Sequence, residues 1–279
     1  MRAAESGLRA EPIAERILRH DGGIFAAASD RILGPVELPP LDLGRHRPDL
    51  VELARRVWSD RVRSEFRSIQ ILARFLSEVV GAGDPVEVYA PVADLVLDEI
   101  RHVRLCAALC ERLGARPVLP DPVELRDPAP FLAAPMAERA LHTAIAMLCI
   151  NETLSVAFVE DLRARCHEPA VRYVLDATLA DEATHDELGW EYARRSLRRF
   201  PPSTLPDWRH LVRLTLEPHQ RFYEPIVRRL DAEGRSLAHF DEPELVALGL
   251  LSPERQALLA RRAVQTRLLP RLAELGLAE

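Results

Sequence analysis

Four long segments of the chain carry apolar residues three and four positions apart, the spacing that places them on one face of an α-helix. The segments cover about residues 49–80, 85–114, 136–166 and 169–199. A glycine-containing stretch followed by Asp84-Pro85 indicates a short turn between the first two. Strand-type alternation is nearly absent. The sequence therefore predicts an all-α fold in which the long helices form two hairpins.

The two hairpins are joined by a proline-rich connection over residues 115–135. Six prolines fall in it, at positions 117, 120, 122, 128, 130 and 135. Because proline lacks a backbone donor and breaks helices, this stretch is predicted to be extended. At about 3.3 Å per residue, it can run the length of a long helix. The order hairpin, crossover, hairpin predicts a four-helix bundle with one long crossover.

Three parts are predicted along the chain. They are an N-terminal extension, a four-helix bundle and a set of C-terminal helices, at residues 1–50, 51–200 and 201–279. The extension carries one short predicted helix at about 8–20, followed by a proline-containing stretch. The C-terminal part carries two longer ones, at about 206–231 and 253–275. These last helices are expected to pack on the bundle or to form the interface of a homodimer.

Two copies of the pattern Asp-Glu-x-x-His lie in the second and fourth predicted helices. They are Asp98-Glu99-Ile100-Arg101-His102 and Asp181-Glu182-Ala183-Thr184-His185. Since residues three apart share a helix face, each copy directs a carboxylate and an imidazole to the same side. The chain has only four Asp-Glu pairs. Two full matches are therefore informative, and their place in the bundle gives them their meaning.

Two further glutamates, Glu65 and Glu152, lie level with these motifs. Glu65 and Glu99 are equally far along the chain from the first turn, and Glu152 and Glu182 are equally far from the second. A single Glu on an apolar stripe usually reaches solvent, but four at one level would strongly disfavour one another without cations. The predicted metal ligands, which are also the predicted catalytic residues, are Glu65, Glu99, His102, Glu152, Glu182 and His185.

This donor set is typical of a carboxylate-bridged pair of metal ions in a helix bundle. Two Fe ions are predicted, with a Mn/Fe pair as the alternative. A ligand His normally donates its other ring N–H to a carboxylate. Asp98 and Asp181 are therefore each expected to reach the His of the opposite motif, and solvated helix residues are the alternative interpretation.

Three more residues are candidates for a pocket beside the metal ions. Cys106 and Cys149 lie on the ligand-bearing faces of their helices, although ordinary core packing is the favoured interpretation for both. Thr178 lies one turn before Glu182, where a small core residue is at least as reasonable as a pocket residue.

Bulk composition limits the partners that the chain is expected to have. A net charge of −6 gives no sign of nucleic acid or an anionic membrane surface as a partner. The sequence shows no run that resembles a signal peptide and no apolar stretch of 18 residues, so no membrane span is expected. The four Cys lack the spacing of a zinc site, and a cytoplasmic protein with reduced thiols is expected.

A basic cluster follows the fourth predicted helix, at Arg194, Arg195, Arg198 and Arg199. A solvated helix end is the favoured interpretation, and docking of an acidic electron-transfer reductase is the alternative.

With these residues the chain resembles the ferritin-like di-iron carboxylate superfamily over about residues 55–195. Cys106 stands four residues after the first ligand His, where ribonucleotide reductase small subunits often carry a radical Tyr, which disfavours a radical-generating role. The ligand spacing is similar to that of p-aminobenzoate-type N-oxygenases, although Thr178 stands where those carry an extra His.

The resemblance implies a non-haem di-iron oxidase or oxygenase that activates O₂ to oxidise a small organic substrate. Two alternatives stay open. One is an iron-handling protein that oxidises Fe²⁺ or scavenges peroxide. The other is a non-catalytic helical protein that binds metal.

Overall fold

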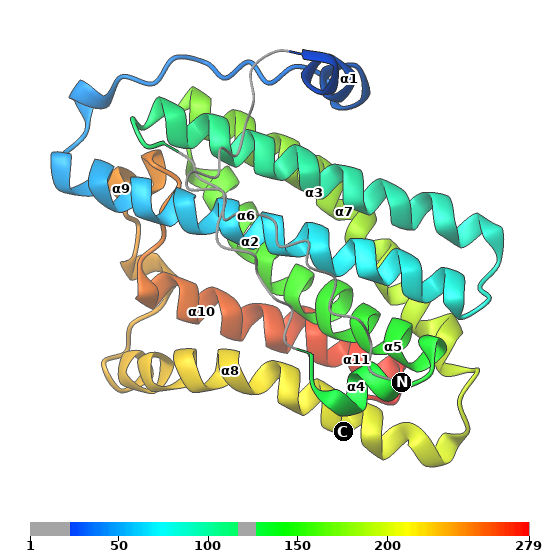
Figure 1. Ribbon diagram of the computed structural model, residues 1–279. Coiled ribbons are helices and arrows are strands. Elements are labelled where there is room, and N and C mark those ends of the chain that lie inside the picture. Colours follow the sequence, from blue (N-terminus) through cyan, green and yellow to red (C-terminus); the bar gives the residue numbers. More distant parts are fainter. Residues whose placement is uncertain (1–22, 117–126, 279) are drawn as a thin grey trace, which may run out of the picture.

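The computed structural model describes residues 23–116 and 127–278, and every regular element in these two ranges is helical (Figure 1). The predicted all-α class is thus confirmed. The short helix expected at about 8–20 lies outside the described residues. The described residues begin with an unexpected helix, α1 (Gly23–Leu33), and a single 3₁₀ turn, η1 (Leu43–Arg45), leads toward the first long helix.

Helices α2 (Pro48–Gly81) and α3 (Val86–Arg112) form an antiparallel hairpin and pack along their whole length. Their bounds agree with the sequence prediction to within a few residues. Gly83 in the turn adopts a φ of 70°, a left-handed conformation that side chains disfavour. Most of the apolar stripe of α2 is buried, including Trp58 and Leu72. Trp58 also donates its indole N–H to the carbonyl oxygen of Leu248, 2.9 Å away.

The third long helix is interrupted, which the sequence did not predict. It begins as α5 (Met136–Thr143), continues as the π-helical segment η2 (Ala144–Asn151) and ends as α6 (Glu152–Arg165). The apolar residues of η2 fit an ordinary helical stripe equally well, so its composition gives no warning of the wider turn. Such π-helical turns are rare and occur frequently at functional sites.

Helix α7 (Pro169–Leu197) runs back along this interrupted helix. The two approach closely at Gly189, where an added Cβ would lie 2.4 Å from the Cβ of Leu148. Glycine is therefore required there for packing. α3 and α7 also contact each other, so α2, α3, the α5–η2–α6 helix and α7 surround a common interior.

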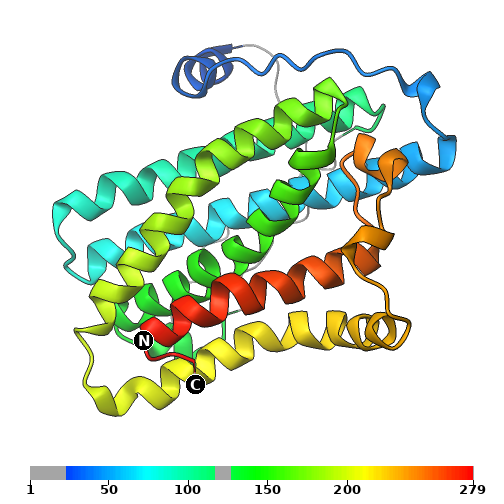
Figure 2. The same ribbon diagram turned by 180° about the vertical axis from the view of Figure 1, so that it is seen from behind.

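The C-terminal helices cover one side of this group. In Figure 2, α8 (Leu205–Ala232) and α10 (Pro253–Ala263) lie side by side, on the side away from α3. α10 packs against α6, and α8 packs against η2. The remaining elements are short: α4 (Ala129–Ala133), η3 (Pro202–Thr204), η4 (Leu237–His239), α9 (Pro243–Ala247), η5 (Val264–Leu268) and α11 (Leu269–Glu274).

One helical stretch, Met136–Arg165, is long and apolar enough to span a bilayer by length and composition alone. The expectation that no segment meets this test was therefore wrong. The stretch is α5–η2–α6, and 61% of its most apolar window is buried inside the structure. A central core helix has the same properties.

Candidate metal centre

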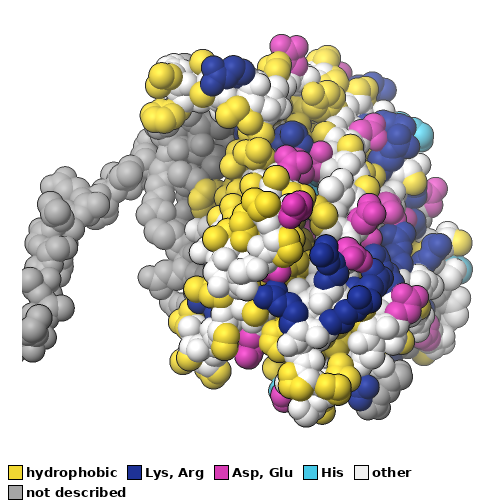
Figure 3. All heavy atoms as spheres, turned by 90° about the vertical axis from the view of Figure 1, so that its right-hand side faces the viewer, with side chains coloured by type: hydrophobic (Ala, Val, Ile, Leu, Met, Phe, Trp, Pro, Cys, Tyr) yellow, Lys and Arg dark blue, Asp and Glu magenta, His cyan; other side chains and the backbone are white. Residues whose placement is uncertain are grey.

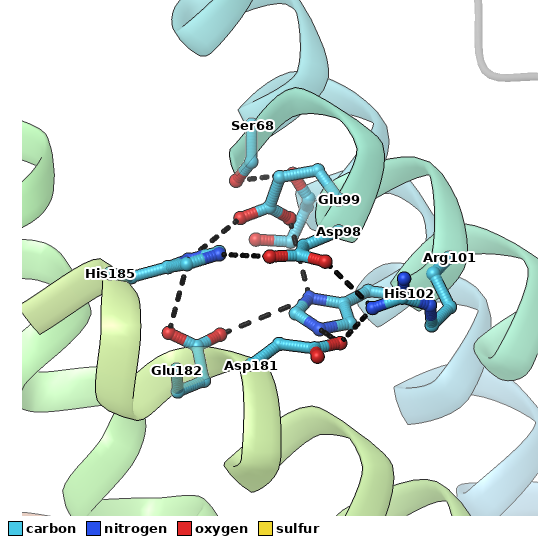
Figure 4. A network of polar contacts seen from close by, with 9 residues as sticks. Ser68, Asp98, Glu99, Arg101, His102, Asp181, Glu182 and His185 are labelled. Atoms are coloured by element: carbon cyan, nitrogen blue, oxygen red, sulfur yellow. Dashed lines mark hydrogen bonds and ion pairs between the residues drawn. The ribbon is translucent and has the colours of Figure 1, made fainter. Parts of the chain in front are cut away.

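The six predicted ligands are brought together in the interior between the four long helices. Glu99 and His102 project from α3, and Glu182 and His185 from α7. All four are at most 5% exposed. Glu65 on α2 is partly buried, and Glu152, the first residue of α6, is buried. Figure 4 shows both imidazoles directed into the space between the Glu99 and Glu182 carboxylates.

Two groups of these side chains lie close enough to hold a metal ion. One consists of Glu65, Glu99 and His102, and the other of Glu99, Glu182 and His185; within each group the ligand atoms lie within 4.8 Å of one another. Glu99 belongs to both groups. Glu152 belongs to neither, although the carboxylates of Glu152 and Glu182 are close enough to share a hydrogen bond.

The two imidazoles and two of the carboxylates are arranged almost symmetrically. His102 Nδ1 lies 3.6 Å from one oxygen of Glu99 and 3.9 Å from one oxygen of Glu182. His185 Nδ1 lies 3.5 Å from the other oxygen of Glu182 and 3.8 Å from the other oxygen of Glu99. Each carboxylate therefore presents one oxygen to each imidazole.

The inward atoms of this arrangement are buried without hydrogen-bond partners. This is true of Nδ1 in His102 and in His185, and of one oxygen each in Glu99 and Glu182. Buried polar atoms are normally paired, and each unpaired one carries a desolvation cost. Four of them facing one point fit a site whose partner is a bound cation.

The outer ring nitrogens are paired as the sequence predicted. His102 Nε2 lies 3.2 Å from an oxygen of Asp181, and His185 Nε2 lies 3.3 Å from an oxygen of Asp98. Each Asp thus contacts the His of the opposite motif. A hydrogen on Nε2 leaves the Nδ1 lone pair free to bind a metal ion.

Arg101, which the sequence analysis did not single out, connects the two aspartates. Its Nη1 lies 2.6 Å from Asp98 and 2.7 Å from Asp181. One guanidinium therefore supports both outer carboxylates and, through them, both imidazoles. In the sequence, Arg101 is marked only by its position immediately before the histidine of the first motif. The second motif has Thr184 at that position.

Burial and charge repulsion dominate the electrostatics of the interior. Burial raises the pKa of Glu99 and of Glu182 well above the usual range, and neighbouring carboxylates raise it further. Burial raises the pKa of Glu152 as well. Without a cation these carboxyl groups therefore hold protons at a higher pH than exposed ones, and a binding metal ion displaces those protons.

The outer shell shows the opposite behaviour. Burial disfavours the charged form of His102, but the carboxylates of Asp181 and Glu99 outweigh it and raise the pKa well above the usual value. Burial likewise disfavours the charged form of Asp181, and its contacts with His102 and Arg101 more than compensate, lowering the pKa. Asp181 is therefore a lasting anion that holds the imidazole in place.

A cavity of about 420 Å³ adjoins the candidate ligands on the carboxylate side. Glu65, Glu152 and Glu182 form part of its wall, and neither histidine ligand does. Helix α8 also contributes to the wall, with His219 and Tyr223, which the sequence did not single out. A larger cavity, of about 660 Å³, lies near the α2–α3 turn and is not lined by any of the candidate ligands.

The three predicted pocket residues lie elsewhere. Cys106 and Cys149 are buried in two apolar core clusters, in agreement with the favoured packing interpretation. Thr178 is buried on α7. None of the three lines the 420 Å³ cavity. All four cysteines are buried free thiols.

The basic cluster that follows α7 is partly neutralised. Arg194 pairs with Glu191 at 2.7 Å, and Arg199 pairs with Asp84 at 2.7 Å. Figure 3 looks onto the end of the molecule that includes the α2–α3 turn, where basic and acidic side chains are interspersed. The pairing fits the solvated helix end that the sequence favoured.

No family model, curated protein or solved structure matches the chain. A function for the chain therefore has to be inferred from the geometry of the site. Within the described residues, the buried Glu and His groups can hold a metal ion. The helices bring all six predicted ligands to one region, with four of them facing a common centre.

Proposed function

We propose that the chain is a non-haem di-iron oxidase or oxygenase of the ferritin-like superfamily. In this proposal α2, α3, the α5–η2–α6 helix and α7 form the four-helix bundle. Two helices contribute one Glu each, and the other two contribute Glu-x-x-His, which is the donor pattern of di-iron and di-manganese carboxylate proteins.

The observation that carries the proposal is the set of four unpartnered inward atoms. Both Nδ1 atoms and one oxygen each of Glu99 and Glu182 are buried around one point without hydrogen bonds. Two overlapping groups, Glu65 with Glu99 and His102, and Glu99 with Glu182 and His185, could each hold an ion. A single ion at the centre would leave Glu65 without a partner cation, which supports two ions rather than one.

A pair of bound iron ions would supply redox chemistry with O₂. The chain's own residues prepare the site for it. Asp98 and Asp181 hold the outer ring nitrogens of the histidines, and Arg101 balances the charge of both aspartates. Glu99, His102, Glu182 and His185 are themselves almost fully buried.

The cavity beside Glu65, Glu152 and Glu182 favours an organic substrate over iron handling. Its wall includes the rings of Phe158 and Tyr223, whose centroids are 6.3 Å apart. A route for hydrated iron ions needs no aromatic wall, whereas pockets for small organic molecules are commonly lined by aromatic side chains.

The test is metal content after anaerobic loading with Fe²⁺, followed by the optical spectrum on exposure to O₂. We expect about two Fe per chain and a new absorption that develops with O₂. The variant Glu182→Ala should lose iron while its circular dichroism stays helical. The control Glu187→Gln, an exposed residue on the same helix, should keep both ions. Failure of the wild-type chain to bind iron would overturn the proposal.

A further inference from the structure

The 420 Å³ cavity has two chemically different walls. One part of the wall consists of the carboxylates of Glu65, Glu152 and Glu182. Another part consists of His219 and Tyr223 from α8. α8 lies outside the four helices that carry the predicted ligands, and none of its residues belongs to the two close ligand groups, so its side chains in the cavity call for a separate explanation.

His219 is held in a defined orientation by Asn151, the residue that precedes Glu152. The Asn151 side-chain amide donates to the carbonyl oxygen of Ala146 at 2.9 Å, which fixes the direction of the amide. Its oxygen then faces His219 Nε2 at 3.0 Å. Since an amide oxygen can only accept, the hydrogen of this bond belongs to His219 Nε2.

This bond determines what the other ring nitrogen can do. Burial lowers the pKa of His219, which favours the neutral imidazole. A neutral imidazole with its hydrogen on Nε2 has a bare lone pair on Nδ1. The side chain has no other hydrogen-bond partner among the described residues, so Nδ1 is available as an acceptor.

The rest of the cavity wall is mixed. Phe158 and Tyr223 pack edge to face, and Ile71, Met147 and Leu154 add apolar surface, while Arg67 and three serines add polar groups. The volume of about 420 Å³ lies within the range of pockets for small organic molecules and admits a substituted benzene ring. A molecule with an apolar body and a hydrogen-bond donor would match the aromatic surface and the acceptor on His219.

We propose that this cavity binds the organic substrate and that His219 positions it by accepting a hydrogen bond from a hydroxyl or amino group. The donor group then lies against α8, and the apolar body lies between α8 and the ligand carboxylates. The inference rests on the proposed oxygenase function for the fate of the bound molecule, but binding itself needs no metal.

The experiment compares two probes of nearly equal size, phenol and toluene, of which only phenol has a donor. Binding is measured by ligand-observed NMR under anaerobic conditions, with the full chain as purified and after Fe²⁺ loading. We expect phenol to bind about three- to tenfold more tightly, the factor that one net hydrogen bond contributes. In His219→Phe the preference should disappear, and in His219→Gln, which keeps an acceptor, it should partly return.

Two further variants serve as controls. His142→Phe changes a histidine on α5 that does not line this cavity and should keep the preference for phenol. Ser155→Trp, at an exposed position on the cavity wall, should weaken binding of both probes by filling the space. If His219→Phe is poorly folded, weaker binding to Ser155→Trp still shows that the probe occupies this cavity.

Equal affinity for the two probes in the wild-type chain would overturn the inference. So would a preference that survives His219→Phe, or probe binding that Ser155→Trp leaves unchanged. Loss of iron binding with an intact His219-dependent preference would instead overturn the proposed function and leave the cavity assignment standing.

Discussion

The two halves of the candidate metal centre carry the same motif on regular helices, α3 and α7, but each motif helix is paired with a differently built partner. In the first half, α2 and α3 are unbroken α-helices, and Glu65 joins Glu99 and His102 in one close group. In the second half, an eight-residue π-helical segment ends immediately before Glu152, which lies outside both close groups. The cavity opens beside this irregular helix. Regular helices thus hold the tight part of the site, and the irregular one makes room beside it.

The largest expected difference between the halves concerns metal content. Glu99 belongs to both close groups and Glu152 to neither. We expect Glu99→Ala to lose almost all bound iron, whereas Glu152→Ala should retain at least about half of it. Elemental analysis after Fe²⁺ loading measures the difference. Equal loss in the two variants would show that the halves contribute equally despite their construction.

The two motifs also differ at the position before the histidine, which is Arg101 in one and Thr184 in the other. Because Arg101 contacts both outer aspartates, Arg101→Gln should weaken metal binding about tenfold, the lower end of the range for groups that support metal ligands. Thr184 is exposed, and Thr184→Ala should have little effect. A metal titration against a chelator of known affinity gives both values, and similar results for the two variants would remove Arg101 from the site.

The close packing between α7 and η2 in the second half can be tested by substituting Gly189. In Gly189→Ala the new methyl group would meet the Cβ of Leu148 at 2.4 Å and its backbone at 3.2 Å. We expect the free energy of unfolding to fall by about 1–3 kcal/mol. Gly81→Ala in the first half meets only the flexible side chain of Met136 and should cost less. Urea unfolding of both variants measures the two losses in the free energy of unfolding. A larger loss for Gly81→Ala than for Gly189→Ala would contradict this account.

The smallest expected effect is the pH dependence of the metal-free protein. Folding raises the pKa of Glu99 and Glu182 above the ordinary 4.5 and that of His102 above 6.5. The folded state then binds more protons than the unfolded state, so these groups favour folding at low pH, and this contribution is lost as pH rises through the raised values. Asp181, whose pKa is lowered from 3.8, has the opposite effect on stability. Its contribution to folding is lost as the pH falls, in a more acidic range than that of the other groups.

We therefore expect the melting temperature of the metal-free protein to fall between about pH 5 and about pH 8. Glu99→Gln should flatten this slope, and bound metal should remove it. Thermal scans monitored by circular dichroism measure all three. A melting temperature that rises over this range without metal would contradict the assigned shifts.

Much of the helical framework could be predicted because it depends on a repeating pattern. The stripes of α2, α3 and α7 extend over many turns, so one or two irregular positions do not hide them. Level positions along the two hairpins predicted which glutamates would meet. The motif spacing was also sufficient to predict that Asp98 and Asp181 would contact opposite histidines.

The missed features depend on single contacts between distant segments. The π-helical segment η2 packs against α7 and α8, and its apolar sequence is equally compatible with an α-helix. His219 meets Asn151 across 68 positions of sequence, and no periodicity marks which residue of α8 makes that contact. Arg101 lay within the motif, but its reach to Asp181 depends on how α3 and α7 are placed.

Because Glu99 and Glu182 each face both imidazoles, two ions bound there would not bind independently. Both positions would share these two carboxylates, and the protons that the carboxyl groups hold without metal would have to leave before ions could bind. Any change that one bound ion caused in the affinity of the other position would be returned by the same factor in the opposite direction. A titration that fits two independent positions would contradict this sharing.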